Sequence, residues 1–248
     1  MIIVVVIPTY NERAAIGRLL EALQGEFRRV PHHTLHILVV DGNSPDGTAV
    51  AVQEAMRQAP NVSLIVEKEK RGLGAAYING MRYAAEELRA DAVVEFDGDF
   101  QHDPKDVPRL IAEFDKGYDY VIGSRYVLGG TVPKTWSRYK KFLSRVGGGW
   151  FTRVMLRIPV RDSTSGFRLS RVKPFFAHLP LDETRILSKR HAYKVHLLYE
   201  MVRAGAKVKE VPIAFLERSG GNSKSTAEDI VETLKVLFAL RFRRRTKR

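Results

Sequence analysis

Residues 92–102 read Ala-Val-Val-Glu-Phe-Asp-Gly-Asp-Phe-Gln-His, a mostly apolar run that ends directly in two carboxylates. The run Ala92–Phe96 is apolar nearly throughout rather than alternating, which is typical of a strand covered on both faces. Asp103 and Pro104 follow as an N-cap and a first helical residue, so a helix is expected to begin there. The stretch therefore predicts a strand, a loop and a helix, with the two carboxylates in the loop.

The same alternation of strand and helix extends from this stretch through the first half of the chain. Four further apolar runs read as strands, at Ile2–Ile7, Leu35–Val40, Val62–Val66 and Tyr118–Ile122. The stretches between the runs predict helices at Glu12–Phe27, Asp46–Gln58, Leu73–Leu88 and Pro104–Lys116. Such alternation over about 120 residues indicates an α/β fold with a mostly parallel sheet flanked by helices.

Each of these expected strands leads into a polar or glycine-containing motif. The motifs are Pro8–Glu12, Asp41–Thr48, Arg71–Gly74, Asp97–His102 and Gly123–Arg125. Ligands of open α/β sheets bind beyond the carboxyl ends of the strands. We therefore expect the five motifs to line one cleft.

The second half of the chain lacks this regular alternation. Its pattern predicts a basic, aromatic-bearing helix broken by three glycines, then another helix and a strand, at residues 136–157, 189–204 and 207–215. A last amphipathic helix is expected from about Thr226 to Phe242. We expect one domain over residues 1–225, and over 226–248 a helix with a basic tail. That helix either packs on the domain or lies at a membrane interface, since apolar and basic residues together attract anionic lipid.

Composition narrows the class of partner. The 248 residues carry a formal net charge of +13, which calls for an anionic partner such as a phosphorylated substrate, a phospholipid surface or nucleic acid. The lack of cysteine excludes a disulfide scaffold, a thiolate metal site and a cysteine nucleophile. No stretch approaches the roughly 20 apolar residues of a membrane span, and the N-terminus reads as a strand rather than as a signal peptide.

The carboxylates after the run at 92–96 are candidate ligands of a hard cation. Mg²⁺ and Mn²⁺ prefer oxygen ligands, and Mg²⁺ usually takes one or two carboxylates together with substrate phosphates and water. Asp97 and Asp99 fit this role, and the Gln101 carbonyl lies on the same side of an extended segment. A bound diphosphate would also need positive charge close by. The candidate cations are Arg125, Arg218 and Lys224.

No Ser/His/Asp arrangement or other general base stands out beside these motifs. A phosphate monoester has a second pKa near ~6, so it is already an anion at neutral pH. Such an acceptor can attack without a general base, if cations position it and a metal ion stabilises the leaving nucleoside diphosphate. The pattern therefore favours transfer to a phosphate acceptor.

Taken together, the motifs resemble those of the family 2 glycosyltransferases, and most closely the dolichyl/polyprenyl-phosphate mannose synthase branch. The resemblance covers nearly the whole chain. It is carried by Val6–Glu12, Ser44–Thr48, Gly72–Tyr77, Asp97–His102, Gly123–Tyr126 and Thr164–Arg168.

The resemblance implies a GT-A-type, Rossmann-like fold with C-terminal amphipathic helices. It also implies an inverting enzyme that uses Mg²⁺ or Mn²⁺ and moves mannose from GDP-mannose to a dolichyl or polyprenyl phosphate. Such an enzyme is expected to be peripheral, at the cytoplasmic face of a membrane. If the chain ends naturally here, without the transmembrane helices of some relatives, a membrane-embedded partner subunit is expected as well.

Roles for individual residues also follow from the resemblance. Asp97, Asp99 and Arg125 are expected to be catalytic, and Asp97, Asp99 and Gln101 are expected to hold the metal ion. Lys140 and Ser144 are expected to bind the acceptor phosphate. The expected contacts of the nucleotide sugar are Pro8, Tyr10, Glu12, Val40, Asp41, Asp97, Gly98, Asp99, Arg125, Arg218 and Lys224.

Two alternatives stay open. Gly42 stands where the family usually carries a second aspartate, which keeps a UDP-sugar donor, such as a glucose-type donor, as the second hypothesis. The basic and aromatic stretch Lys134–Arg161 gives partial support to a nucleic-acid-binding protein. That third hypothesis leaves Asp97, Asp99 and the strand-end motifs unexplained, so no nucleic-acid partner is expected.

Overall fold

Strand β1 (Ile2–Thr9) lies inside the sheet, because it pairs in parallel with β2 (Thr34–Asp41) on one side and with β4 (Ala92–Glu95) on the other. Its residues Ile3 to Ile7 are fully buried. Helices cover both faces of the strand, which explains why its side chains are apolar throughout rather than alternating. The computed structural model describes residues 1–217 and 227–243.

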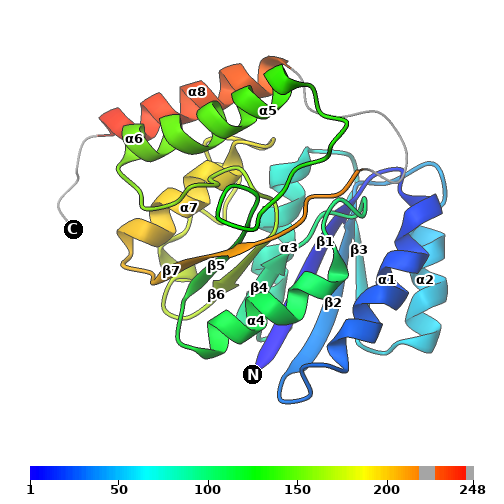
Figure 1. The fold of residues 1–248 in the computed structure, drawn as a ribbon. Coiled ribbons are helices and arrows are strands. Elements are labelled where there is room, and N and C mark those ends of the chain that lie inside the picture. The colour runs from blue at the N-terminus through cyan, green and yellow to red at the C-terminus, as the bar shows by residue number, and fades with distance from the viewer. Residues whose placement is uncertain (218–226, 244–248) are drawn as a thin grey trace.

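Within these described residues, the sheet has seven strands in the order β3-β2-β1-β4-β6-β5-β7 (Figure 1). The edge strand β3 (Val62–Val66) pairs in parallel with β2, and the edge strand β7 (Val208–Pro212) pairs in parallel with β5 (Tyr120–Ser124). Among the described strands, only β6 (Arg168–Arg171) runs antiparallel, between β4 and β5. The predicted α/β fold with a mostly parallel sheet is confirmed, and β6 is the strand that the sequence pattern missed.

Two sets of helices cover the two faces of the sheet. One face carries α1 (Arg13–Phe27), α2 (Thr48–Gln58) and α4 (Val107–Asp115), and the other carries α3 (Leu73–Glu86) and α7 (Tyr193–Arg203). Short 3₁₀ turns occur at Pro104–Asp106 and Phe176–His178. At the first of these turns, the Asp103 side chain accepts a hydrogen bond of 3.0 Å from the Lys105 N–H, so the predicted N-cap is confirmed.

A further layer lies above α7, made of α5 (Arg138–Arg145), a π-helical turn (Val146–Phe151), α6 (Thr152–Leu156) and α8 (Ala227–Phe242) (Figure 1). The glycines at 147–149 were expected to break a helix, and instead they form the π-helical turn that continues it. A Cβ on Gly149 would lie 2.5 Å from the Arg161 carbonyl oxygen, so the close approach of that segment explains a glycine here.

Helix α8 packs on the layer below through part of its surface only. Val236, Leu237 and Leu240 are buried in the same core cluster as α7, whereas Ile230 and Phe238 are about half exposed. The predicted boundary between residues 225 and 226 lies outside the described residues. Of the helices that the structure describes, none combines the length and the apolarity needed to cross a membrane.

The packing of α3 on the sheet gives a test of this fold. A Cβ on Gly80 would lie 2.5 Å from Val6 Cγ1 and 3.0 Å from Val40 Cγ2, two fully buried side chains. We expect Gly80→Ala to lower the free energy of unfolding by about 1–3 kcal/mol, because the core would be overpacked. Chemical denaturation measures this change.

Gly17→Ala is the matched control, because a Cβ on this glycine of α1 meets no atom within 4 Å. It should leave stability unchanged or raise it by up to about 1 kcal/mol, as alanine favours a helix over glycine. Equal effects of the two substitutions would contradict the close packing of α3 on β1.

Candidate functional site

A cavity of about 990 Å³ opens at the carboxyl ends of the parallel strands. All five motifs that follow the expected strands contribute to its wall, so the predicted convergence into one cleft is confirmed. Their lining residues include Pro8, Tyr10, Glu12, Gly42, Arg71, Gly72, Asp97, Gly98, Asp99, Gln101, His102 and Arg125. Residues of helices α5 and α8 also line the cavity.

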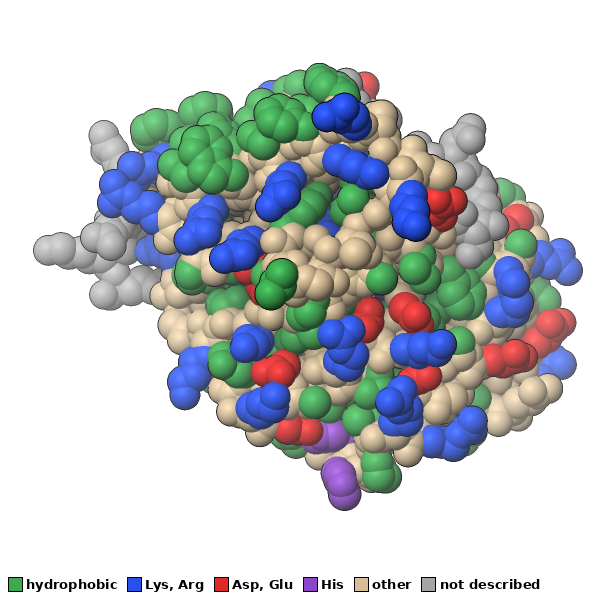
Figure 2. All heavy atoms as spheres, viewed as in Figure 1, with side chains coloured by type: hydrophobic (Ala, Val, Ile, Leu, Met, Phe, Trp, Pro, Cys, Tyr) green, Lys and Arg blue, Asp and Glu red, His purple; other side chains and the backbone are tan. Residues whose placement is uncertain are grey.

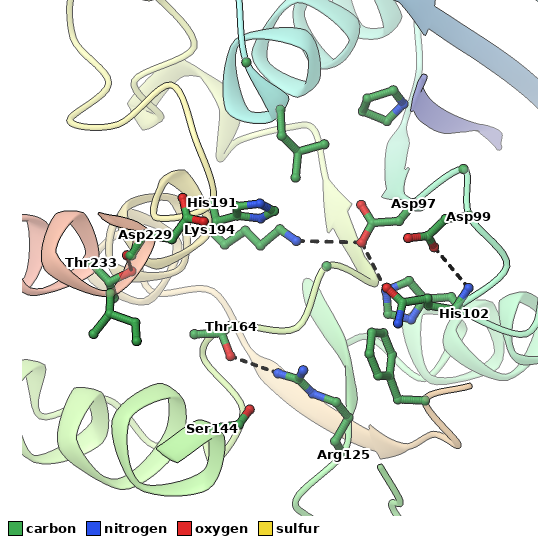
Figure 3. Close-up of a pocket in the computed structure, with 18 of the residues that line it drawn as sticks. Asp97, Asp99, His102, Arg125, Ser144, Thr164, His191, Lys194, Asp229 and Thr233 are labelled. Carbon is green, nitrogen blue, oxygen red and sulfur yellow. Dashed lines mark hydrogen bonds and ion pairs between the residues drawn. The ribbon is translucent and has the colours of Figure 1, made fainter. Parts of the chain in front are cut away.

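Asp97 is surrounded by donors from three different parts of the chain. The Tyr77 hydroxyl donates to its Oδ1 at 2.8 Å, and its Oδ2 lies 3.5 Å from His102 Nε2 and 3.8 Å from Lys194 Nζ (Figure 3). Burial alone would raise the pKa of Asp97, but Lys194, His102 and Tyr77 together outweigh burial and hold the pKa well below its usual range. Asp97 is therefore a carboxylate at neutral pH.

Asp99 and Gln101 lie beside Asp97 on the same wall. The Gln101 N–H donates to Asp99 Oδ1 at 3.0 Å, and the Gln101 carbonyl accepts a hydrogen bond of 2.8 Å from the Leu216 N–H. Among residues 1–217 and 227–243, no group of three or more acidic or histidine side chains is arranged to hold a metal ion unaided. Asp97 and Asp99 still fit a hard divalent cation that takes its remaining ligands from water and substrate phosphate.

Arg125 lines the cavity, but its charge is engaged within the protein. Its Nε and one terminal nitrogen donate to the two oxygens of the buried Asp162 at 2.8 and 2.7 Å, and the guanidinium also donates to Thr164 Oγ1 at 2.9 Å. Burial works against both charges, yet each partner favours the other, so the pKa of Asp162 is lowered and that of Arg125 is raised. The pair fixes the loop after residue 161 against the end of β5.

The two residues expected to bind an acceptor phosphate are brought into this cavity by α5. Ser144 is hydrogen-bonded to the Tyr126 hydroxyl, and Lys140 Nζ lies 4.3 Å from the centre of the Trp136 ring. Within the described residues, Lys140 forms no ion pair with a carboxylate. Because Asp162 offsets the charge of Arg125, Lys140 is the more available positive charge on this wall.

The residues expected to bind the nucleotide sugar are only partly brought together. Pro8, Tyr10, Glu12 and Gly98 line the cavity. Val40 and Asp41 are fully buried behind its wall, and both Asp41 oxygens accept hydrogen bonds from Thr9 or Ser44. Arg218 and Lys224 lie outside the described residues.

Several lining residues were absent from the expected site, above all Lys194 and His191 at the start of α7 and Asp229 and Thr233 on α8 (Figure 3). Burial lowers the pKa of His191, and Lys194 adds to that effect. No periodic pattern marks these residues, since they read as ordinary polar positions of amphipathic helices. The structure brings Lys194 and His191 to the cavity because α7 begins beside the end of β4, where the Tyr193 hydroxyl donates to Glu95 Oε1 at 2.9 Å.

Arg168 holds this region together. Its fully buried guanidinium donates to the carbonyls of Ser163, Ser165 and Lys194 at 2.6–2.8 Å, and to the Tyr120 hydroxyl at 2.9 Å. Those acceptors lie in the 162–166 loop, on α7 and on β5. One side chain thereby fixes the loop that carries Asp162 against the start of α7.

Comparison with known proteins identifies relatives along almost the whole chain. The model of glycosyl transferase family 2 matches residues 4–176. The polyprenol monophosphomannose synthase of Mycolicibacterium smegmatis is 36% identical over 236 residues, covering 93% of this chain and 83% of that protein. The undecaprenyl-phosphate mannosyltransferase of Micrococcus luteus is 36% identical over 238 residues, covering 94% of this chain and 91% of that protein.

Solved structures share the fold at much lower sequence identity. Glucosyl-3-phosphoglycerate synthase from Mycobacterium tuberculosis superposes with a TM-score of 0.70 at 16% identity, over 96% of this chain and 79% of that one. A mannosyltransferase from Pyrobaculum calidifontis, in complex with GDP-Man and Mn²⁺, gives a TM-score of 0.58 at 19% identity, over 89% and 58% of the two chains. These neighbours confirm the expected GT-A-type architecture.

The buried pair of Arg125 and Asp162 makes a prediction about stability. We expect Arg125→Ala to lower the free energy of unfolding by about 3–5 kcal/mol, because a buried carboxylate would lose its counter-ion. Since the pKa of Asp162 is lowered in the folded state, the pair stabilises at neutral pH, and the effect should fade as pH falls below about 4. Denaturant unfolding at several pH values measures both effects.

Arg29→Ala serves as the control, since this arginine pairs with Glu26 at 3.0 Å while its side chain is 63% exposed. The loss should stay below about 1 kcal/mol. An Arg125→Ala variant as stable as Arg29→Ala would refute the structural role of the buried pair.

Proposed function

The chain belongs to glycosyl transferase family 2, and from this premise we propose that it transfers mannose from GDP-mannose to a dolichyl or polyprenyl phosphate, with inversion and with Mg²⁺ or Mn²⁺. One observation carries the proposal. A single cavity joins the carboxylates Asp97 and Asp99 to the cation Lys140 and then to apolar side chains between α5 and α8. Along its length, such a cavity suits first a charged donor, then a phosphate acceptor and then a hydrocarbon chain.

The donor diphosphate is placed at Asp97 and Asp99. These two carboxylates would hold a divalent cation, which would neutralise the charge that develops on the leaving nucleoside diphosphate. Arg218 and Lys224 remain proposed phosphate contacts. At the far end of the same wall, Lys70 Nζ lies 3.8 Å from the centre of the Tyr10 ring, next to Gly42. We assign this end to the nucleoside.

The acceptor phosphate is placed at Lys140 and Ser144. A phosphate monoester is ionised at neutral pH, so its oxygen can attack the anomeric carbon without a general base. The bond from that carbon to the diphosphate breaks as the new bond forms, and the nucleoside diphosphate leaves with the electron pair. A single displacement of this kind inverts the configuration, and Lys140 orients the attacking phosphate.

The hydrocarbon part of the acceptor is placed between α5 and α8. Leu143 of α5 and Ile230, Leu234 and Leu237 of α8 line this part of the cavity. Figure 2 shows hydrophobic side chains gathered on the outer edge of the same layer, with Lys and Arg side chains beside them. Tyr139, Phe142, Trp150, Val154 and Phe242 are each more than half exposed there.

An exposed apolar surface with flanking basic residues is suited to the interface of an anionic membrane. We therefore place the layer of α5, α6 and α8 on the cytoplasmic face of a membrane, with the enzyme bound peripherally. The same surface is our proposed contact for a membrane-embedded partner subunit. Relatives named for polyprenol and undecaprenyl phosphate support an acceptor that resides in a membrane.

Asp99→Asn tests the donor site. We expect sugar transfer into polyprenyl phosphate to fall about a hundredfold or more, because one of the two carboxylates for the metal ion is lost. The assay uses radiolabelled GDP-mannose with added Mn²⁺ or Mg²⁺, and excess chelator should abolish transfer by the wild type. Asp115→Asn, on the exposed end of α4, should retain full activity.

The same assay decides the donor. Transfer from UDP-glucose but not from GDP-mannose, blocked by UDP and not by GDP, would overturn the mannose assignment. Full activity of Asp99→Asn, or activity in excess chelator, would overturn the metal role.

The proposed membrane surface is tested by the double substitution Phe142→Ser and Trp150→Ser. We expect binding to vesicles that contain phosphatidylglycerol to weaken about tenfold or more, because two large apolar side chains are lost from the interface. Co-sedimentation measures the binding. Val50→Ser on α2 removes a side chain that is 54% exposed, on a helix of the opposite face, and should leave binding unchanged. Equal binding of the double variant and the wild type would contradict this orientation.

A further inference from the structure

Lys194 places an ammonium group inside the donor half of the cavity. Its side chain is 7% exposed, and its Nζ lies 3.8 Å from Asp97 Oδ2. In Figure 3 the side chain extends from the first turn of α7 across the cavity toward Asp97. At this distance the two groups form an ion pair but no hydrogen bond, and Lys194 is also one of the residues that line the cavity.

The backbone around this ion pair is built to permit it. The Lys194 carbonyl accepts a hydrogen bond of 2.6 Å from the buried Arg168 guanidinium, which fixes the position of the residue. Gly166 lies between the two charged groups, where a Cβ would come within 2.5 Å of both Asp97 Oδ2 and Lys194 Nζ. The absence of a side chain at position 166 is therefore what lets the ammonium approach Asp97.

The position of Lys194 changes the net charge of the proposed metal site. Asp97 and Asp99 alone would present two negative charges, and Lys194 offsets one of them before any ligand binds. Asp97 also accepts a hydrogen bond from Tyr77, and Asp99 accepts one from Gln101, so both carboxylates already have partners within the protein. The free site should therefore attract a divalent cation less than two unpaired carboxylates would.

We propose that Lys194 is a resident cation that shares Asp97 with the divalent metal, so that the free enzyme binds the metal weakly and the metal enters together with the donor diphosphate. The proposal rests on the metal and donor site of the proposed function and assigns a positioning role to a residue outside it. A bound diphosphate brings its own negative charges, which restore the attraction that Lys194 removes.

The test is direct Mn²⁺ binding, measured from the electron paramagnetic resonance signal of free Mn²⁺ with and without GDP. Without nucleotide, we expect Lys194→Met to bind Mn²⁺ about fivefold to a hundredfold more tightly than the wild type, because one positive charge is removed beside the site. GDP should then improve Mn²⁺ binding by a smaller factor in the variant than in the wild type. Lys194→Gln should act in the same direction and supplies the measurement if Lys194→Met fails to fold.

Lys116→Met is the matched control, because it also removes an ion-paired ammonium, 2.7 Å from Glu113, but on the exposed end of α4. Its Mn²⁺ affinity should equal that of the wild type. If Lys194 had only a structural role, replacing it would leave the Mn²⁺ affinity unchanged or weaken it. That result would overturn the proposal.

Asp99→Asn separates this outcome from a failure of the proposed function. If Asp99→Asn abolishes Mn²⁺ binding with GDP while the Lys194 variants match the wild type, the metal site stands and only the role of Lys194 is refuted. If wild type, Asp99→Asn and the Lys194 variants all fail to bind Mn²⁺ with either GDP or UDP, the metal site itself is refuted.

Discussion

The buried guanidinium of Arg168 is the interaction on which the arrangement of the site depends. Leaving a charged group in a core is costly unless its donors are paired, and here carbonyls and a hydroxyl from three segments pair with it. Moving any one of those segments would leave part of the guanidinium unpaired. The 162–166 loop, the start of α7 and β5 are consequently held as one unit. This unit holds Asp162 against Arg125 and Lys194 beside Asp97.

Much of the fold and of the cleft could be predicted, because the first half of the chain follows local rules. Apolar runs buried on both faces predicted the parallel strands, and the polar motifs after them share one edge of the sheet by geometry. The strand Arg168–Arg171 was not predicted from the sequence, because polar residues interrupt it and it contains no apolar run. Arg168 and Ser170 are nevertheless buried. Its burial is decided by hydrogen bonds to distant segments, which no local pattern records.

The site shows the same division between local and distant causes. Asp97 and Asp99 could be proposed from their position after a strand, and the cavity contains both. The ion pair of Arg125 with Asp162 could not be predicted, since Asp162 lies 37 residues further along the chain. Lys194 reads as an ordinary lysine of an amphipathic helix, and only the tertiary structure shows that it is buried beside Asp97.

Gly166 has an evolutionary consequence that concerns two positions at once. A side chain at this position would push Asp97 and Lys194 apart, since its Cβ would lie 2.5 Å from each of the two charged groups. Positions 166 and 194 are therefore not free to vary independently. A lineage that acquires a larger residue at 166 must give up the lysine or move α7, whereas a lineage that loses the lysine is released from the glycine. Among descendants of a common ancestor, this contact should therefore appear as covariation between positions 166 and 194.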